Sequence, residues 1–304
     1  MPTKSARFKA VDALLLALAG LPLVCGMVLK ILTTPSSADI DISGALIYFT
    51  IPMPWQPLPI TESQVNSWLV MLTIFWLCVY LTHGIAARPI TRRQLIAEWI
   101  VEKTDNLIRD NMDPYFKSFS PFIAAIMGLS AFSSLLTLVG LTAPTADLNV
   151  VGGWALLVFF LITYYKCKCG PLHYLKSFCE PAILTPLNII SEVATPISMA
   201  FRHYGNVLSG AVISVLIGTG LQGLSKLLLG WLPGLLGNIP LLQVGLPAVL
   251  SLYFDIFSGL LQAFIFAMLT MLYISGGFPA DDYSARKAKR QAHKDHPSAT
   301  AAEK

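Results

Sequence analysis

The stretch Pro186–Gly210 reads PLNIISEVATPISMAFRHYGNVLSG, and Arg202 lies within it. Between Glu192 and Lys226, Arg202 is the only Asp, Glu, Lys or Arg residue in a largely apolar run. A guanidinium placed in hydrocarbon costs several kcal/mol or more, and it cannot release its proton to become neutral. We therefore interpret Arg202 as part of an ion pathway, or as the partner of another charge inside a membrane.

Composition places the chain in a membrane. Of its 304 residues, 55% are hydrophobic and 12% are charged, whereas a soluble domain carries about 25% charged residues. Crossing a bilayer takes roughly 20 apolar residues. The candidate spans lie at about 11–32, 67–87, 119–141, 150–165, 185–224 and 241–275. We predict an all-α polytopic membrane protein with about six transmembrane helices.

The basic residues set the predicted orientation. About 18 of the 21 lysines and arginines lie in the N-terminus, in 88–118, in 166–183 and in the tail from Asp281. Because cytoplasmic segments of membrane proteins are enriched in basic residues, we place these four segments inside. Lys30 and Lys226 then lie outside. Because the basic residues are spread along the chain, they do not indicate nucleic-acid binding.

The chain divides into an N-terminal anchor span with an outer loop (1–60), a membrane domain (61–280) and a cytoplasmic basic tail (281–304). A cleaved signal peptide is the alternative for the first span, but the apolar core exceeds the usual length of about 7–15 residues, so we favour an uncleaved anchor. Segment 92–113 carries apolar residues at helical spacing with charges on the other face. It is predicted to be an amphipathic interfacial helix, with a soluble loop helix as the alternative.

Polar residues form a stripe along the segment that contains Arg202. They recur every three or four residues, the spacing of one helical face. They are Asn188, Ser191, Glu192, Thr195, Ser198, Arg202, Asn206 and Ser209. A continuous helix of about 40 residues would be about 60 Å long, roughly twice the hydrocarbon thickness. We expect this helix to tilt steeply, bend, or break at Pro196 or a glycine, as a helix lying along a curved partner would.

Asp255 is a second isolated charge, in the last apolar stretch, with Gln262 on the same predicted face. Antiparallel spans place Asp255 nearer the outside and Glu192 nearer the cytoplasm, with Arg202 between them. This arrangement predicts two aqueous half-paths that do not connect. At about 4 Å and an effective dielectric near 20, Arg202 favours an ionised carboxylate by about 4 kcal/mol, so a mobile acid passing it releases its proton or cation. The alternative is a salt bridge that only holds helices together.

The pattern P-x-N-x-x-x-E-x-x-x-P-x-S-x-x-x-R-x-x-G-N over 186–206 resembles subunit a of F-type ATP synthases. PTADLN at 144–149, VNSW at 65–68 and LQAFIFAMLTMLYIS at 261–275 are similar to further signatures of that family. The resemblance covers roughly residues 60–280. The extra N-terminal span is not part of the minimal family pattern.

The resemblance implies a non-catalytic stator subunit in a bacterial inner (plasma) membrane, with its two long tilted C-terminal helices facing a ring of c subunits. Its further partners would be the b-subunit stalk, the rest of the F-type ATP synthase and membrane lipid. H⁺ or Na⁺ would pass through two half-channels while ring carboxylates rotate past Arg202. By position, the ion-pathway residues would be Asp255, Gln262, Asn206, Ser198, Glu192, Asn188 and Asp147.

The chain departs from the family pattern near Arg202. Ala211 stands where many members carry Glu, so the outer path is expected to rest on Asp255, aided by Asp147. His203-Tyr204 replaces the usual Leu-Phe. We interpret His203 as a packing or interface residue, with a proton relay as the alternative.

Other chemistries have less support in the sequence. Cys167, Cys169 and His173 do not have zinc-ribbon spacing, so we expect no metal site. There is no Walker loop, and we expect no cofactor. Two other functions are a secondary transporter that uses Arg202 to bind an anionic substrate, and a purely structural membrane scaffold.

Overall fold

A computed structural model describes residues 4–33, 46–54, 56–85, 91–170, 174, 184–229, 249–250, 252–280 and 283–284. By length and composition, six of its helices can cross a membrane, and the predicted all-α multi-pass fold is confirmed. These spans are Ala10–Thr33, Glu62–Thr82, Pro114–Val139, Leu148–Lys166, Thr185–Leu228 and Leu252–Gly277. The N-terminal part of the predicted last span lies largely outside the described residues.

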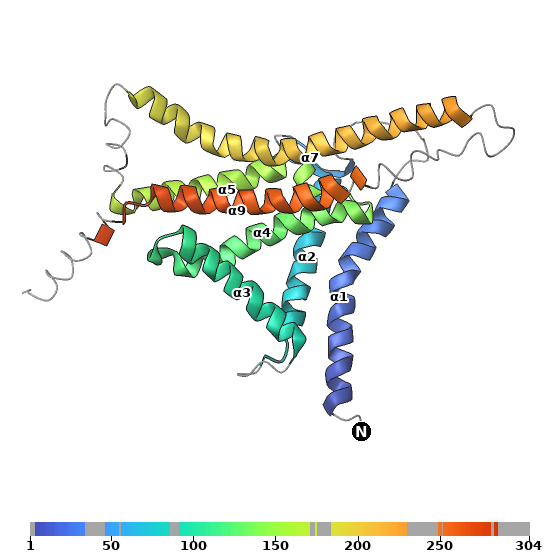
Figure 1. The fold of residues 1–304 in the computed structure, drawn as a ribbon, viewed down its shortest axis with the longest axis horizontal. Helices are drawn as coiled ribbons and strands as arrows, with labels where there is room; N and C mark the ends of the chain where they lie inside the picture. Colours follow the sequence, from blue (N-terminus) through green and yellow to red (C-terminus); the bar gives the residue numbers. More distant parts are fainter. Residues whose placement is uncertain are drawn as a thin grey trace, which may run out of the picture.

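Helices α1 (Lys4–Thr33) and α2 (Glu62–Thr82) lie side by side. Both are oriented at a large angle to α5, α7 and α9 (Figure 1). The start of α2 follows from its sequence, because the Thr61 hydroxyl accepts a hydrogen bond from the Gln64 N–H at 3.4 Å. Strands β1 (Ile47–Ile51) and β2 (Leu58–Thr61) pair antiparallel just before α2. The sequence analysis did not predict this small sheet in the proline-rich outer connection.

The central layer contains α4 (Ser120–Leu135), α5 (Leu148–Lys166), α7 (Thr185–Leu229) and α9 (Gly259–Gly277) (Figure 1). Buried residues recur every three or four positions along α5, which gives it one core-facing stripe. The main hydrophobic core lies between these helices, with Val158 and Phe266 among its buried members. This core therefore supports α7 from one side.

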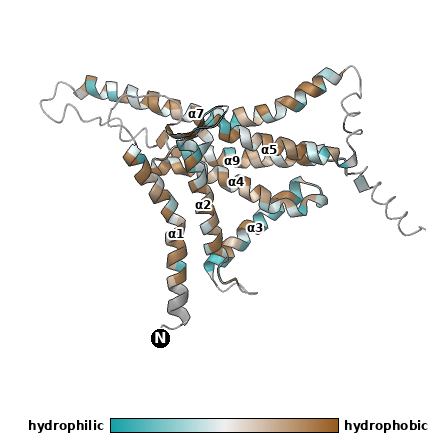
Figure 2. Cartoon of the chain, turned by 180° about the vertical axis from the view of Figure 1, so that it is seen from behind, coloured by the Kyte–Doolittle hydropathy of each residue, from teal (hydrophilic) through white to brown (hydrophobic). Residues whose placement is uncertain are grey.

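Helix α3 (Arg92–Asn111) matches the predicted amphipathic helix to within two residues. Leu95, Ile96, Trp99 and Ile100 are exposed on it. Figure 2 shows hydrophilic residues distributed along α3, whereas α1 and α2 are mainly hydrophobic. These features agree with the proposed position at the membrane surface, which stays a prediction.

Helix α7 is continuous over 45 residues, although Pro196 lies inside it. It bends into a shallow arc whose concave side faces away from α5 and α9 (Figure 1). Proline removes one helical hydrogen bond and crowds the preceding turn, which favours bending of a long helix. Of the three predicted outcomes, α7 therefore bends rather than breaks, and it lies steeply to α1 and α2.

The last span begins with η7 (Leu252–Ser258), a π-helical segment that continues into α9. The sequence pattern predicts a regular α-helix here, and the π-helical segment corrects that prediction. Each π-helical turn contains more residues than an α-helical turn, so the positions before Gly259 do not keep the predicted phase with Gln262. Short π-helical segments occur frequently at functional sites.

Candidate functional site

Arg202 lies on α7 with its side chain exposed in the isolated chain. It makes no hydrogen bond or ion pair with any other described residue. The neighbouring position, His203, is about 100° around the helix and is fully buried. Arg202 therefore lies beside the contact face of α7, not on it, and neither Asp255 nor Glu192 forms a salt bridge with it.

His203 anchors the contact face of α7. Its Nε2 lies 3.3 Å from Ser130 Oγ of α4, and its ring meets the rings of Trp154 and Phe266 edge to face at centroid distances of 6.2 and 5.5 Å. Contacts with three neighbouring helices restrict rotation of α7 about its axis. This geometry supports the interpretation of His203 as a packing residue. Its burial leaves Arg202 on the exposed side of α7.

The predicted polar stripe runs along the edge of the α7 contact face. Ser198 and Arg202 lie on its exposed side, and Asn206 is half-buried on the side that faces η7. Ser258 Oγ donates to Asn206 Oδ1 at 2.9 Å, and Asn206 Nδ2 donates to the Ser258 carbonyl at 3.5 Å. The stripe therefore contacts the last span at Asn206, whereas its side chains at Ser198 and Arg202 are exposed.

Asp255 lines a pocket of about 210 Å³ that we call the outer pocket. Its lining residues are Ser134, Thr137, Thr142, Ala143, Ala146, Asn206, Val207, Gly210, Ala211, Phe254, Asp255 and Gly259. A Cβ at Gly210 would lie 3.1 Å from Phe254 Cβ, so glycine permits the close approach of α7 to η7. Ala211, nine residues after Arg202, also lines this pocket.

Glu192 lines a second pocket of about 270 Å³, the inner pocket. Its lining residues are Phe159, Ile162, Lys166, Ser191, Glu192, Thr195, Leu272, Tyr273, Gly276 and Gly277. Lys166 Nζ lies 2.9 and 2.7 Å from the two carboxylate oxygens of Glu192. The Tyr174 hydroxyl donates to Glu192 Oε1 at 3.1 Å. Burial and the Glu192 carboxylate raise the pKa of Tyr174 to about 12, so its hydroxyl keeps the proton it donates.

The two pockets occupy different stretches of the same two helices. On α7 the inner pocket ends at Thr195 and the outer pocket begins at Asn206, about 16 Å further along a helix. On the last span Gly259 lines the outer pocket and Leu272 is the first residue of α9 in the inner one. The segment between the pockets contains Arg202 on α7 and Gln262, which is buried, on α9.

Asp147 and Asn188 lie next to the pockets but do not line them. The Asp147 carboxylate accepts a hydrogen bond from the Asn149 N–H at 2.9 Å and caps the start of α5, while Ala146 beside it lines the outer pocket. Asn188 is half-buried one turn before the inner-pocket residues of α7. Their contribution to an ion pathway stays a prediction.

Comparisons with known proteins identify the family. A family model described as ATP synthase A chain matches residues 64–275. Proteins named ATP synthase subunit a 1 from Crocosphaera subtropica and ATP synthase subunit a from Priestia megaterium are 30% and 32% identical to this chain. The alignments cover 73% and 74% of this chain, and 89% and 95% of the relatives.

The chain belongs to the ATP synthase A chain family. A further relative, ATP synthase subunit a of Legionella pneumophila, is 28% identical over 232 residues, or 75% of this chain. Membership and the six apolar helices make this chain a multi-pass membrane protein. Helix α1 precedes the segment that the ATP synthase A chain model matches.

Two residues that contact Glu192, Lys166 and Tyr174, were not predicted from the sequence. Lys166 was counted only as a cytoplasmic basic residue, although its place at the end of an apolar span was a usable signal. Tyr174 gave no signal, because it lies outside every predicted span. His173, one of the three residues considered for a metal site, lies outside the described residues.

Proposed function

We propose that this chain is the ion-translocating stator subunit of a bacterial F-type ATP synthase. It couples the flow of H⁺ or Na⁺ to rotation of a c-subunit ring and so to ATP synthesis on other subunits. The ring, the b-subunit stalk and membrane lipid are its partners in this proposal. The observation that carries it is Arg202, exposed and without a partner among the described residues, between two separate pockets.

Arg202 acts on a carboxylic acid that belongs to the ring. When the acid comes within about 4 Å, the guanidinium favours its ionised form by about 4 kcal/mol at an effective dielectric near 20. The acid then gives its ion to one pocket and reloads from the other as the ring turns. Because Arg202 is a fixed cation between the pockets, it also opposes direct leakage of cations from one to the other.

The remaining residues divide between the two half-channels. Asp255 and Asn206 serve the outer half-channel through the pocket they line, with Asp147 near its wall. Glu192 serves the inner half-channel, with Asn188 one turn away. Ser198 and Gln262 lie in the stretches of α7 and α9 between the residues that line the two pockets. The concave side of α7 has a shape that suits a curved partner such as a ring, and this favours the proposal (Figure 1).

Replacement of Arg202 tests the proposal. In assembled complexes reconstituted into vesicles, Arg202→Ala is expected to lower ATP synthesis driven by an imposed ion gradient by about 100-fold or more, the loss typical of removing a preorganised charged group. Lys226→Ala, at an exposed residue of the same helix, is the matched control. Coupling that survives in Arg202→Ala would overturn the assignment. Substrate uptake by this chain alone would favour a secondary transporter.

The coupling ion is decided by a separate measurement. An imposed sodium gradient drives ATP synthesis in the presence of a protonophore only if Na⁺ is carried. If synthesis then stops, H⁺ is the coupling ion. Either result leaves the assignment of Arg202 in place.

A further inference from the structure

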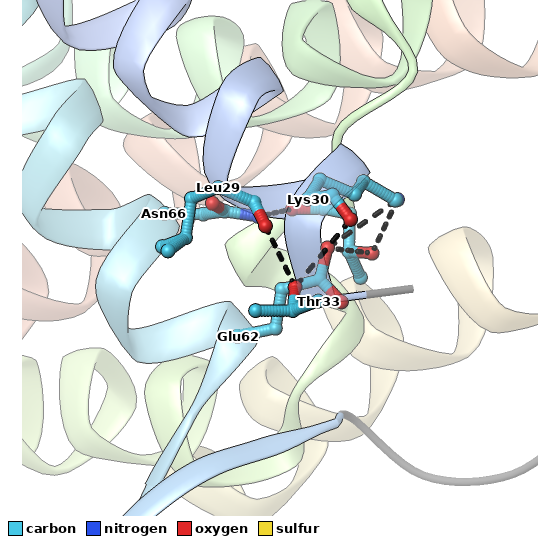
Figure 3. Close-up of polar contacts among 6 residues, drawn as sticks. Leu29, Lys30, Thr33, Glu62 and Asn66 are labelled. Carbon is cyan, nitrogen blue, oxygen red and sulfur yellow. Dashed lines mark hydrogen bonds and ion pairs between the residues drawn. The ribbon is translucent and has the colours of Figure 1, made fainter. Parts of the chain in front are cut away.

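Helix α1 is joined to the membrane domain by a charged contact at its last turns. Lys30 Nζ of α1 lies 3.3 Å from Glu62 Oε1 at the first residue of α2 (Figure 3). The Lys30 side chain is 31% exposed, whereas that of Glu62 is only 3% exposed. A buried carboxylate needs a cation and hydrogen-bond donors, and α1 provides the cation here.

Thr142 connects this ion pair to the outer pocket. Its hydroxyl accepts a hydrogen bond from Lys30 Nζ at 3.3 Å and donates to Glu62 Oε1 at 2.8 Å. Its carbonyl accepts a hydrogen bond from Asn66 Nδ2 of α2 at 2.8 Å. Thr142 and the next residue, Ala143, both line the pocket that holds Asp255. Three side chains from α1 and α2 therefore fix one point of the pocket wall.

The exposures of the two charged side chains make the pair asymmetric. Without Lys30, Glu62 would keep a buried charge with Thr142 as its donor, and removing one partner of a buried pair is strongly destabilising. Without the charge of Glu62, Lys30 is exposed enough for water to solvate its ammonium group. Loss of both charges leaves a neutral cluster in which Thr142 is still held by Asn66.

We propose that Lys30 is a positioning residue for the outer half-channel, through which α1 holds Thr142 and the pocket wall beside Asp255 in place. This inference rests on the proposed function, because only then is the outer pocket an ion path. In this proposal α1, which lies outside the segment that the family model matches, helps to keep the outer pocket accessible to ions. In this arrangement Glu62 holds Lys30 and Thr142 and does not carry ions.

The ion dependence of ATP synthesis tests this inference. In assembled complexes, Lys30→Met should raise the half-saturating outer ion concentration by about tenfold, a typical coupling between contacting residues. Glu62→Gln should raise it about twofold or less, and the double variant Lys30→Met/Glu62→Gln should return to within about twofold of the original chain. Lys226→Met is the matched control. General destabilisation would instead lower the maximal rate together with the amount of assembled complex.

Two results would overturn the inference. If Glu62→Gln is as damaging as Lys30→Met, Glu62 itself carries ions. If the double variant does not recover, or if Lys30→Met has no effect on half-saturation or labelling, Lys30 does not position the pocket through Glu62.

A second measurement separates the inference from the proposed function. A cysteine is placed at Ala143, which is 2% exposed, after the five native cysteines are replaced by serine. Lys30→Met should raise the labelling rate by a membrane-impermeant maleimide by about tenfold, since the wall opens locally more often. An unchanged labelling rate overturns the inference, whether or not this chain conducts ions. Faster labelling with unchanged ATP synthesis means that the wall is positioned as inferred but that the pocket is not an ion path.

Discussion

The two pockets beside α7 hold their acids in different ways. In the inner pocket Glu192 lies on a regular α-helix, and both of its carboxylate oxygens contact Lys166 Nζ. In the outer pocket Asp255 lies on the π-helical η7, and the other described residues that line this pocket carry hydroxyl, amide or apolar side chains or are glycine. Within the described lining, the inner pocket therefore places a cation beside its acid, whereas the outer pocket surrounds its acid with uncharged groups.

This difference assigns different work to the two acids. Glu192 is held in place by Lys166 Nζ and by the Tyr174 hydroxyl, so it is suited to shape the inner pocket. Asp255 lies on a π-helical segment, and such segments occur frequently at functional sites. We therefore propose that Asp255 exchanges the ion in the outer half-channel and that Glu192 shapes the path of the inner one.

Replacement of Asp255 should have the largest effect in this comparison. Asp255→Asn keeps the shape of the side chain but removes the exchangeable charge, and ATP synthesis per assembled complex is expected to fall about 100-fold, at the low end for loss of a group that transfers protons. Asp105→Asn, at an exposed acid of α3, is the control. A loss smaller than that of Glu192→Gln would reverse the assignment of the two acids.

Separation of Lys166 from Glu192 should have a smaller effect. Lys166→Met leaves a carboxylate that is 17% exposed without its cation, and ATP synthesis is expected to fall about fivefold. The double variant Lys166→Met/Glu192→Gln should regain most of that loss, because no uncompensated charge remains. A double variant worse than either single variant would show that Glu192 exchanges ions itself.

The close approach of α7 to η7 is tested at glycine. In Gly210→Ala the new Cβ would lie 3.1 Å from Phe254 Cβ, so one of the two helices must shift by a few tenths of an ångström. Overpacking of this kind costs about 1 kcal/mol or more and should lower the thermal unfolding temperature of the complex. Gly220→Ala is the matched control on the same helix, because a Cβ there meets no atom within 4 Å. Equal unfolding temperatures for the two variants would mean that the outer pocket is loosely packed.

The main features of α7 could be predicted from the sequence because each stands out locally. A charge in an apolar run is visible without knowledge of its neighbours, and this identified Arg202 and Glu192 on α7, as it identified Asp255 on the last span. The length of the run predicted a helix too long to cross a membrane upright, and α7 is long, continuous and bent. Helical spacing also predicted the polar stripe, whose Asn206 meets the last span.

Features that depend on distant contacts or irregular backbone could not be predicted. Lys30 and Glu62 are separated by the whole outer connection, and nothing in their local sequence pairs them. Lys166 has the position of an ordinary cytoplasmic lysine, and its contact with Glu192 requires that α5 and α7 lie together. The π-helical η7 could not be predicted, because a regular helical period of 3.6 residues places Asp255 and Gln262 on one face.

Removal of the Tyr174 hydroxyl should have the smallest effect and should be independent of pH near neutrality. Tyr174→Phe loses one hydrogen bond to Glu192, worth about 0.5–1 kcal/mol of folding stability, and leaves the Lys166 pair in place. Because the folded-state pKa is raised from 10.0 to about 12, this stabilisation is present below pH 10 and is lost as the pH rises through about 12. Thermal unfolding of the assembled complex at pH 7 and pH 9 should therefore give the same small difference. A difference that disappears between these two pH values would mean that Tyr174 ionises well below its ordinary pKa of 10.0, which would contradict the raised pKa.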